Sequence, residues 1–251
     1  MKAIILSAGH GRRLLPMTAS IPKCLLDIHG QSVVEWQIDH LLDNGVDDIT
    51  VVVGYGADLV EARLSEVYPS QKVKTLYNPF FDVTDNLATV WMAREKLVGD
   101  FILLNGDTLF ESELLRSLLS APHKPITLAR DLKSRYDSDD MKMALDGDRL
   151  LRVGKDLGKV AVDGESIGMM LFRGRGGEQF REAVEQAMRK PVALRQWYLS
   201  VIDKLASQGQ VWSHSIQGLQ WGELDYPVDL DKALKMAAGW LVSKDKHRLA
   251  L

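Results

Sequence analysis

The residue types best suited to chemistry in this sequence gather in a glycine-rich segment directly after the first apolar run. That run, residues 3–7, is followed by Gly9, Gly11 and Arg13 and then by Lys23. Because glycines lack side chains, the backbone N–H groups of such a loop can approach phosphate oxygens. Arg13 and Lys23 would add the fixed positive charge that a triphosphate requires. The segment therefore predicts a phosphate-binding loop.

Two other kinds of phosphate loop do not fit this segment. A dinucleotide-binding loop needs Gly-x-Gly-x-x-Gly, but Leu14 stands where the third glycine belongs. The second predicted strand also ends in Gly54-Tyr55-Gly56 and lacks the acidic partner of the ribose. A Walker loop would need Gly-Lys-Ser/Thr, which does not follow here. An NAD-dependent oxidoreductase is therefore disfavoured.

Asp107 is the first residue that could hold a metal ion beside this loop. It ends the fourth predicted strand, and ligands of open parallel sheets bind beyond the carboxyl ends of the strands. Transfer from a nucleoside triphosphate needs a divalent cation, and Mg²⁺ takes oxygen ligands such as carboxylates. Gly106, directly before it, would permit close approach of the nucleotide.

Alternating strand and helix patterns predict the scaffold that positions these residues. We expect an α/β fold, a Rossmann-like three-layer α/β/α sandwich with a mostly parallel mixed sheet. Strands are predicted over residues 3–7, 49–53, 73–77, 101–104, 126–129, 141–145, 150–153 and 167–172. Helices are predicted over residues 32–42, 57–67, 85 or 86 to 97, 177–188, 194–206 and from 227. The polar run 133–140 is predicted to be a loop at the sheet edge.

Composition excludes several classes of protein. The 251 residues carry a net charge of −3, which disfavours a nucleic-acid binder and a polybasic membrane protein. The single cysteine allows neither an internal disulfide nor a cysteine zinc site. No apolar run is long enough for a signal peptide or a membrane helix, so we expect a cytoplasmic protein without membrane insertion. We expect one domain over residues 1–251, with a nucleotide-binding half (1–120) and an acceptor-binding half (121–251).

The glycine segment also resembles the signature of the sugar-nucleotide and cytidylyl nucleotidyltransferases. The matching residues are Ala8-Gly9-His10-Gly11-Arg12-Arg13, Pro16, Thr18 and Pro22-Lys23. The resemblance implies the fold of nucleotide-diphospho-sugar transferases, a loop around a nucleoside triphosphate, Arg13 on the β- and γ-phosphates and Lys23 on the α-phosphate. It makes Arg13, Lys23 and Asp107 the catalytic residues. His10 and Arg12 occupy variable positions and receive no role.

The same resemblance extends to the segment from Trp221 to Pro227 and places a second metal ligand at Asp225. Two carboxylates suit Mg²⁺, which is the implied cofactor. The alternative is that Asp225 only caps the helix that begins at Pro227. We expect Glu223 to point away from the metal and to lie behind its ligands.

The short bacterial phosphocholine cytidylyltransferases and inositol-1-phosphate cytidylyltransferases are the members that this sequence resembles most. Asn86 and Thr89 would then face the base, although Asn86 could instead cap a helix. With these two, the implied nucleotide-binding residues are Leu6, Ala8, Gly9, Gly11, Arg13, Lys23, Asn86, Thr89 and Gly106.

Four residues are expected to bind the acceptor. Trp197 and Trp221 could offer aromatic faces to a trimethylammonium group, or could simply pack in the core. Lys142 and Glu165 suit an acceptor phosphate and polyol hydroxyls, or are an exposed strand residue and a turn residue.

These residues together predict a Mg²⁺-dependent nucleotidyltransferase. The resemblance implies that it joins the nucleoside monophosphate of CTP to a small phosphorylated acceptor such as phosphocholine and releases pyrophosphate. Sugar-1-phosphates, inositol-1-phosphate and aminoethylphosphonate remain alternative acceptors, and a catalytically silent nucleotide-binding module is the alternative from another class. A homodimer is a further expectation from the resemblance.

Overall fold

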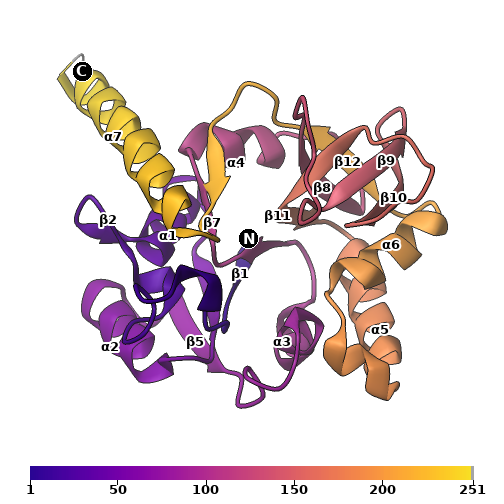
Figure 1. Ribbon diagram of the computed structural model, residues 1–251, viewed down its shortest axis with the longest axis horizontal. Helices are drawn as coiled ribbons and strands as arrows, with labels where there is room; N and C mark the ends of the chain where they lie inside the picture. Colours follow the sequence, from indigo (N-terminus) through magenta and orange to yellow (C-terminus); the bar gives the residue numbers. More distant parts are fainter. Residues whose placement is uncertain (250–251) are drawn as a thin grey trace.

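A nine-stranded sheet forms the centre of the computed structural model, which describes the backbone of residues 1–249 and the side chains of residues 1–242 (Figure 1). The strand order is β5-β4-β1-β6-β11-β8-β12-β10-β9. Its strands are β1 (Lys2–Ser7), β4 (Asp48–Val53), β5 (Val73–Tyr77), β6 (Phe101–Asn105), β8 (Ile126–Asp131), β9 (Lys142–Asp146), β10 (Arg149–Gly154), β11 (Gly164–Phe172) and β12 (Trp212–Ser215). Two short pairs, β2 (Asp27–Ile28) with β3 (Gln31–Ser32) and β7 (Thr108–Phe110) with β13 (Trp221–Glu223), lie outside this sheet.

The sheet is mixed and runs through both halves of the chain. Strands β5, β4, β1 and β6 pair in parallel, whereas β11 pairs antiparallel with β6 and β8. Because β11 joins the two halves edge to edge, they share one sheet. The predicted α/β class with a mixed sheet is confirmed.

Helices cover both faces of the sheet and make three layers. One face packs against α3 (Asn86–Met92), α5 (Gly176–Met188) and α6 (Leu199–Ser207). The other face packs against α1 (Val33–Asp43), α2 (Ala57–Val67) and α4 (Ser112–Leu119). Successive strand residues alternate between the two layers, as Ile4 and Ile5 do in β1.

The last helix, α7 (Pro227–Leu249), packs outside these layers and projects from the body in Figure 1. Ala233, Ala237 and Trp240 of α7 contribute to a third core cluster together with Trp36 of α1 and Leu224. This packing fixes the segment before α7, which carries Asp225.

Several helix boundaries differ from the prediction. The helix that begins at Asn86 ends at Met92 and gives way to a 3-10 turn, Arg94–Lys96, so it is not continuous to residue 97. The predicted helix over residues 194–206 was wrong at its start, because Pro191–Arg195 forms a 3-10 helix and α6 begins only at Leu199. Trp197 therefore lies in the link between them.

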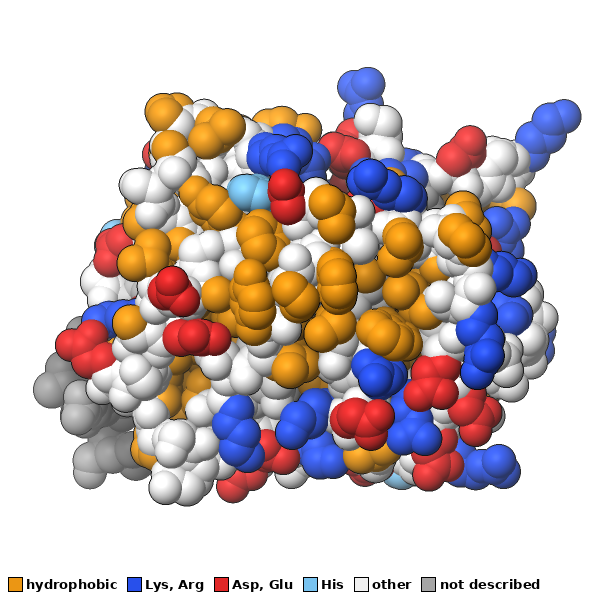
Figure 2. Space-filling model, turned by 90° about the horizontal axis from the view of Figure 1, so that it is seen from below, with side chains coloured by type: hydrophobic (Ala, Val, Ile, Leu, Met, Phe, Trp, Pro, Cys, Tyr) orange, Lys and Arg blue, Asp and Glu red, His pale blue; other side chains and the backbone are white. Residues whose placement is uncertain are grey.

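Some features of the surface were not predicted. Hydrophobic side chains gather on the face seen from below Figure 1, where the connection between β5 and α3 lies (Figure 2). Phe80 and Val83 of this connection are 50% and 57% exposed.

Among the described residues, no helix is both long and apolar enough to cross a membrane.

Candidate active site

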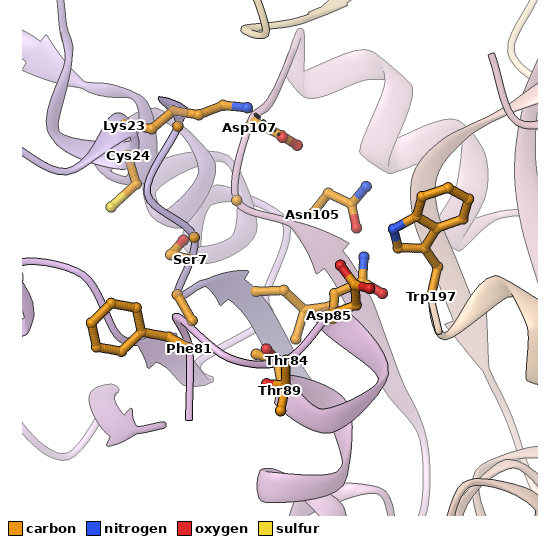
Figure 3. A pocket seen from close by; sticks show the side chains of 16 residues that line it. Ser7, Lys23, Cys24, Phe81, Thr84, Asp85, Thr89, Asn105, Asp107 and Trp197 are labelled. Atoms are coloured by element: carbon orange, nitrogen blue, oxygen red, sulfur yellow. Dashed lines mark hydrogen bonds and ion pairs between the residues drawn. The ribbon is translucent and has the colours of Figure 1, made fainter. Parts of the chain in front are cut away.

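A cleft at the carboxyl edge of β1 and β6 consists of two adjoining cavities. The glycine-loop cavity has a volume of about 270 Å³ and the outer cavity about 830 Å³. They share four lining residues, which we call the junction: Asn86, Asn105, Asp107 and Trp197. Figure 3 shows the glycine-loop cavity and the labelled side chains around it. Two substrates bound in these cavities would meet at the junction.

The glycine loop has the open backbone that its sequence predicted. A Cβ atom on Gly9 would meet nothing within 4 Å, so this part of the loop faces free space in the cavity. Gly11 has a φ of +62° and its carbonyl accepts a hydrogen bond from Thr18 Oγ1 at 2.8 Å. A Cβ on Gly11 would lie 2.9 Å from Lys23 Cβ, so a glycine here lets the Lys23 stem pass behind the loop.

Lys23 brings the two predicted metal carboxylates together. Its Nζ atom lies 2.7 Å from Asp107 Oδ2 and 2.8 Å from Asp225 Oδ1. Burial opposes the charge on Lys23, but Asp107 and Asp225 outweigh that effect and raise its pKa. Lys23 is therefore a fixed cation between two carboxylates that are far apart in the sequence.

Asp225 does not cap α7. Its carboxylate is directed to Lys23 and to Arg13 Nη2, which is 3.0 Å away, and not to an N–H group of the first helical turn. Asp229, in that first turn, accepts from the backbone N–H groups of Asp225 and Tyr226, at 3.3 and 2.9 Å. Asp229 therefore holds the segment that carries Asp225 against the start of the helix.

Glu223 faces the cleft, which corrects the expectation that it points away. Residues two apart in an extended segment lie on the same side, so Glu223 and Asp225 share a face while Leu224 between them is buried. Burial, together with the negative charges of Asp107 and Asp225, raises the pKa of Glu223 to about 8.

The residues at this position fit a magnesium ion. Asp107 Oδ1 is buried and has no hydrogen-bond partner, while Asp107 Oδ2 and Asp225 Oδ1 converge on one cation. Within the described residues, no set of three or more His, Cys, Asp or Glu side chains is arranged to hold a metal. Two carboxylates, with phosphate and water oxygens completing the shell, are the donor set that Mg²⁺ commonly takes.

Arg13 connects the glycine loop to the outer cavity. Its guanidinium lies 2.8 Å from Asp139 Oδ2, in the loop between β8 and β9, and donates to Asp225 as well. Asp139 Oδ1 also pairs with Lys155 at 2.7 Å. These side-chain pairs close part of the outer cavity around Asp139.

His10 and Arg12, which received no role from the sequence, hold a neighbouring loop. Both pair with Asp82, and the His10 ring packs 4.3 Å from the Tyr55 ring and 5.3 Å from the Phe81 ring, measured between centroids. They tie the glycine loop to the connection between β5 and α3, which lines the same cavity.

The remaining nucleotide-binding residues of the sequence analysis lie in or beside the glycine-loop cavity. Leu6, Ala8, Asn86 and Thr89 line it. Asn86 does not cap α3, because its Oδ1 accepts from the backbone N–H of Tyr198 at 2.9 Å and the N-cap position belongs to Asp85.

Gly106 also lines the cavity, but the structure gives it a different reason to be glycine. A Cβ there would lie 2.2 Å from Ser7 Oγ and 2.6 Å from the Leu6 carbonyl oxygen. Close packing of β6 against β1 therefore requires glycine at this position, whether or not a nucleotide is bound.

Two of the four expected acceptor residues line the outer cavity. Trp197 is 42% exposed and lies at the junction, and Trp221 donates from Nε1 to Asp131 Oδ2 at 2.8 Å. Lysine ammonium groups already lie over both rings, Lys155 at 4.3 Å from the Trp197 centroid and Lys133 at 5.7 Å from that of Trp221.

The other two expected acceptor residues lie behind the cavity wall. Lys142 donates to the backbone carbonyls of Asp137 and Lys155. Glu165 is buried and pairs with Lys133 at 2.7 Å, and burial raises its pKa to about 7. Lys133, which the sequence analysis missed, is the one of these three that reaches the cavity.

Asn105 and Asp139 were also missed. Asn105 stands directly before the Gly106-Asp107 pair, which is the signal that could have drawn attention to it. Asp139 lies in the polar run 133–140, whose turn-forming composition predicted a loop but no partner.

The fold is shared with nucleotidyltransferases of known structure. The structure superposes on CTP:phosphocholine cytidylyltransferase from Streptococcus pneumoniae with a TM-score of 0.77 and 18% identity, covering 94% of this chain and 98% of that one. It superposes on the inositol-1-phosphate CTP transferase from T. maritima with a TM-score of 0.76 and 22% identity, covering 93% and 96%. At such identities these likenesses establish the fold.

The family follows from the sequence comparison. Residues 3–216 match the MobA-like NTP transferase domain, and the chain belongs to this family. A relative in Streptomyces rubellomurinus, CMP-5'-(3-aminopropyl)phosphonate synthase, is 30% identical over 93% of this chain and 38% of its own length. The bifunctional IPC transferase and DIPP synthase of Aquifex aeolicus is 26% identical over 93% of this chain and 51% of its own length. The chain thus spans about half the length of these relatives, or less.

Proposed function

We propose that this protein transfers the cytidylyl group of CTP to a small acceptor that carries a phosphate or phosphonate, with release of pyrophosphate. The observation that carries the proposal is the Lys23 ammonium held between Asp107 and Asp225 at the junction of the two cavities. The preference for CTP is supported by the names of relatives that are cytidylyltransferases, including the 2-aminoethylphosphonate enzyme of Lancefieldella rimae.

In this proposal the triphosphate lies along the glycine loop. An acceptor oxygen attacks the α-phosphorus, a new P–O bond forms, and the bond to pyrophosphate breaks. Lys23 stabilises charge on the α-phosphoryl group, and Arg13 does so on the departing pyrophosphate. Because the acceptor is already an anion, no covalent intermediate with the enzyme is required.

Asp107 and Asp225 would hold Mg²⁺. When bound, the ion supplies charge neutralisation for the phosphate oxygens. The remaining contributions come from the chain itself: the glycine backbone admits the phosphates, and Lys23 and Arg13 supply positive charge. The sequence alternatives of sugar-1-phosphate and inositol-1-phosphate acceptors belong to the same reaction class.

The test is pyrophosphate release with ATP, GTP, CTP and UTP against phosphocholine, 2-aminoethylphosphonate, inositol-1-phosphate and glucose-1-phosphate. We expect release with CTP and at least one acceptor in Mg²⁺, and none after chelation with EDTA. Binding of CTP measured by calorimetry without pyrophosphate release from any pair would instead favour a silent nucleotide-binding module.

A further inference from the structure

One buried tyrosine orients two amide side chains at the junction. Tyr198 is fully buried, its backbone N–H donates to Asn86 Oδ1 at 2.9 Å, and its hydroxyl donates to Asn105 Oδ1 at 2.8 Å. A backbone N–H can only donate, so the oxygen of Asn86 must face Tyr198 and its NH₂ group must face away. The same residue thus fixes asparagines of α3 and of β6.

Asn105 is held from a second side by β11. Gly168 has a φ of +72°, and a Cβ on it would lie 2.3 Å from Asn105 Nδ2 and 2.6 Å from its Cγ. The amide therefore packs directly on the Gly168 backbone. Figure 3 shows Asn105 between Asp107 and Trp197, facing the cleft.

Both amide NH₂ groups are left as donors. Within the part of the chain that the structure describes, no hydrogen bond joins Nδ2 of Asn86 or Nδ2 of Asn105 to another residue. The other two junction residues are a carboxylate, Asp107, and an aromatic ring, Trp197. The amides are therefore neutral donors at the place where the cavities meet, beside the indole N–H of Trp197.

Two of the peptide N–H groups at the start of α3 are already occupied. The N–H of Asp85 donates to the Leu194 carbonyl at 2.9 Å, and that of Leu87 donates to the Gln196 carbonyl at 3.2 Å. The segment before α6 thus occupies these donors and leaves the Asn86 side chain as the polar group that α3 presents to the junction.

We propose that Asn86 and Asn105, oriented by Tyr198, bind the phosphate or phosphonate group of the acceptor. The inference rests on the proposed function, because it assumes that a nucleotide fills the glycine-loop cavity. Reaction requires the acceptor oxygen to lie about 3–3.5 Å from the α-phosphorus, and only the junction borders both cavities. Two aimed N–H donors hold the acceptor anion there without neutralising the nucleophile. Tyr198 is then a positioning residue.

The experiment compares Tyr198→Phe with the wild type. Loss of one neutral hydrogen bond frees the Asn105 amide, so we expect the acceptor KM to rise about three- to ten-fold. The nucleotide KM and kcat should stay within about twofold. Tyr68→Phe is the matched control, because the Tyr68 hydroxyl donates to Asp39 far from the cleft. Melting temperatures of both variants reveal any general loss of stability.

A binding assay separates this inference from the proposed function. Methylphosphonate is titrated into protein saturated with a CTP analogue that has a methylene group between the α- and β-phosphates. We expect weaker methylphosphonate binding in Tyr198→Phe, and at least a thirty-fold loss in Asn105→Asp, where a carboxylate oxygen replaces the donor. Wild-type protein that binds no nucleotide overturns the proposed function. Protein that binds the analogue but not methylphosphonate, or binds both unchanged in Tyr198→Phe, overturns only the inference.

Discussion

The two cavities of the cleft are built in different ways. The glycine-loop cavity is lined by short consecutive stretches at the ends of β1 and β6, where the sheet fixes the backbone. The outer cavity is lined by side chains from separate segments, held by ion pairs such as Lys133–Glu165 and Lys155–Asp139. A backbone-built cavity resists change of shape, whereas a cavity held by ion pairs can rearrange when a charged substrate competes for its partners.

The largest expected effect comes from removing the cation between the two cavities. Lys23→Ala deletes the charge proposed for the α-phosphate and leaves Asp107 without its cation, while Asp225 keeps Arg13 alone. We expect kcat/KM for pyrophosphate release to fall about 100- to 1000-fold. Lys74→Ala is the control, because Lys74 pairs with Asp48 at the start of β4, away from the carboxyl edge of the sheet that carries the cleft. Transfer that survives within threefold would refute the role of Lys23.

Rigidity of the backbone-built cavity can be tested at Gly106. The Cβ of Gly106→Ala would clash with Ser7 and with the Leu6 carbonyl, so we expect a loss of about 2–3 kcal/mol in the free energy of unfolding. Gly9→Ala meets no atom and should keep its stability while weakening nucleotide binding. Urea denaturation and calorimetric titration with CTP measure the two effects. Equal stability of the two variants would show that the packing of β6 on β1 tolerates a side chain.

The difference between the two cavities also explains how much of the cleft could be predicted from the sequence. The glycine loop, Lys23 and Asp107 follow from local spacing after strands, and the structure brings them together at one sheet edge. The helix predicted over residues 32–42 is likewise present, and a capping box at Ser32 begins it. Local patterns contain no information about which distant side chains pair, so the contacts of Asp139 and of Tyr198 could not be predicted. The predicted orientation of Glu223 was wrong, because residues two apart in an extended segment, such as Glu223 and Asp225, lie on the same side of it.

The free energy of unfolding should depend on pH through Glu165, the buried carboxyl group behind the outer cavity. Burial raises the pKa of Glu165 to about 7, above the unfolded value near 4.5, so the folded protein binds more protons between these pH values. Its contribution to stability is therefore complete below about pH 4.5 and declines as the pH rises to about 7. We expect Glu165→Gln to remove about 1 kcal/mol of that decline, measured by urea denaturation at pH 5 and pH 7.5. Parallel curves for both proteins would mean that Lys133 keeps Glu165 ionised.

The smallest effect concerns the ion pair between Arg13, which follows the glycines of the loop, and Asp139 of the outer cavity. Asp139 occupies Arg13, the residue proposed to bind the β- and γ-phosphates, and so competes with the nucleotide for it. Asp139→Asn should lower the Kd for CTP about threefold, because exposed ion pairs contribute less than about 1 kcal/mol. Added salt should shrink the difference, since salt screens exposed charges. Asp146→Asn, which breaks a similar exposed pair with Arg149, is the control. Weaker CTP binding in Asp139→Asn would contradict this competition. It would mean that Asp139 holds Arg13 in the orientation that binds the nucleotide, so that a residue of the outer cavity assists CTP binding.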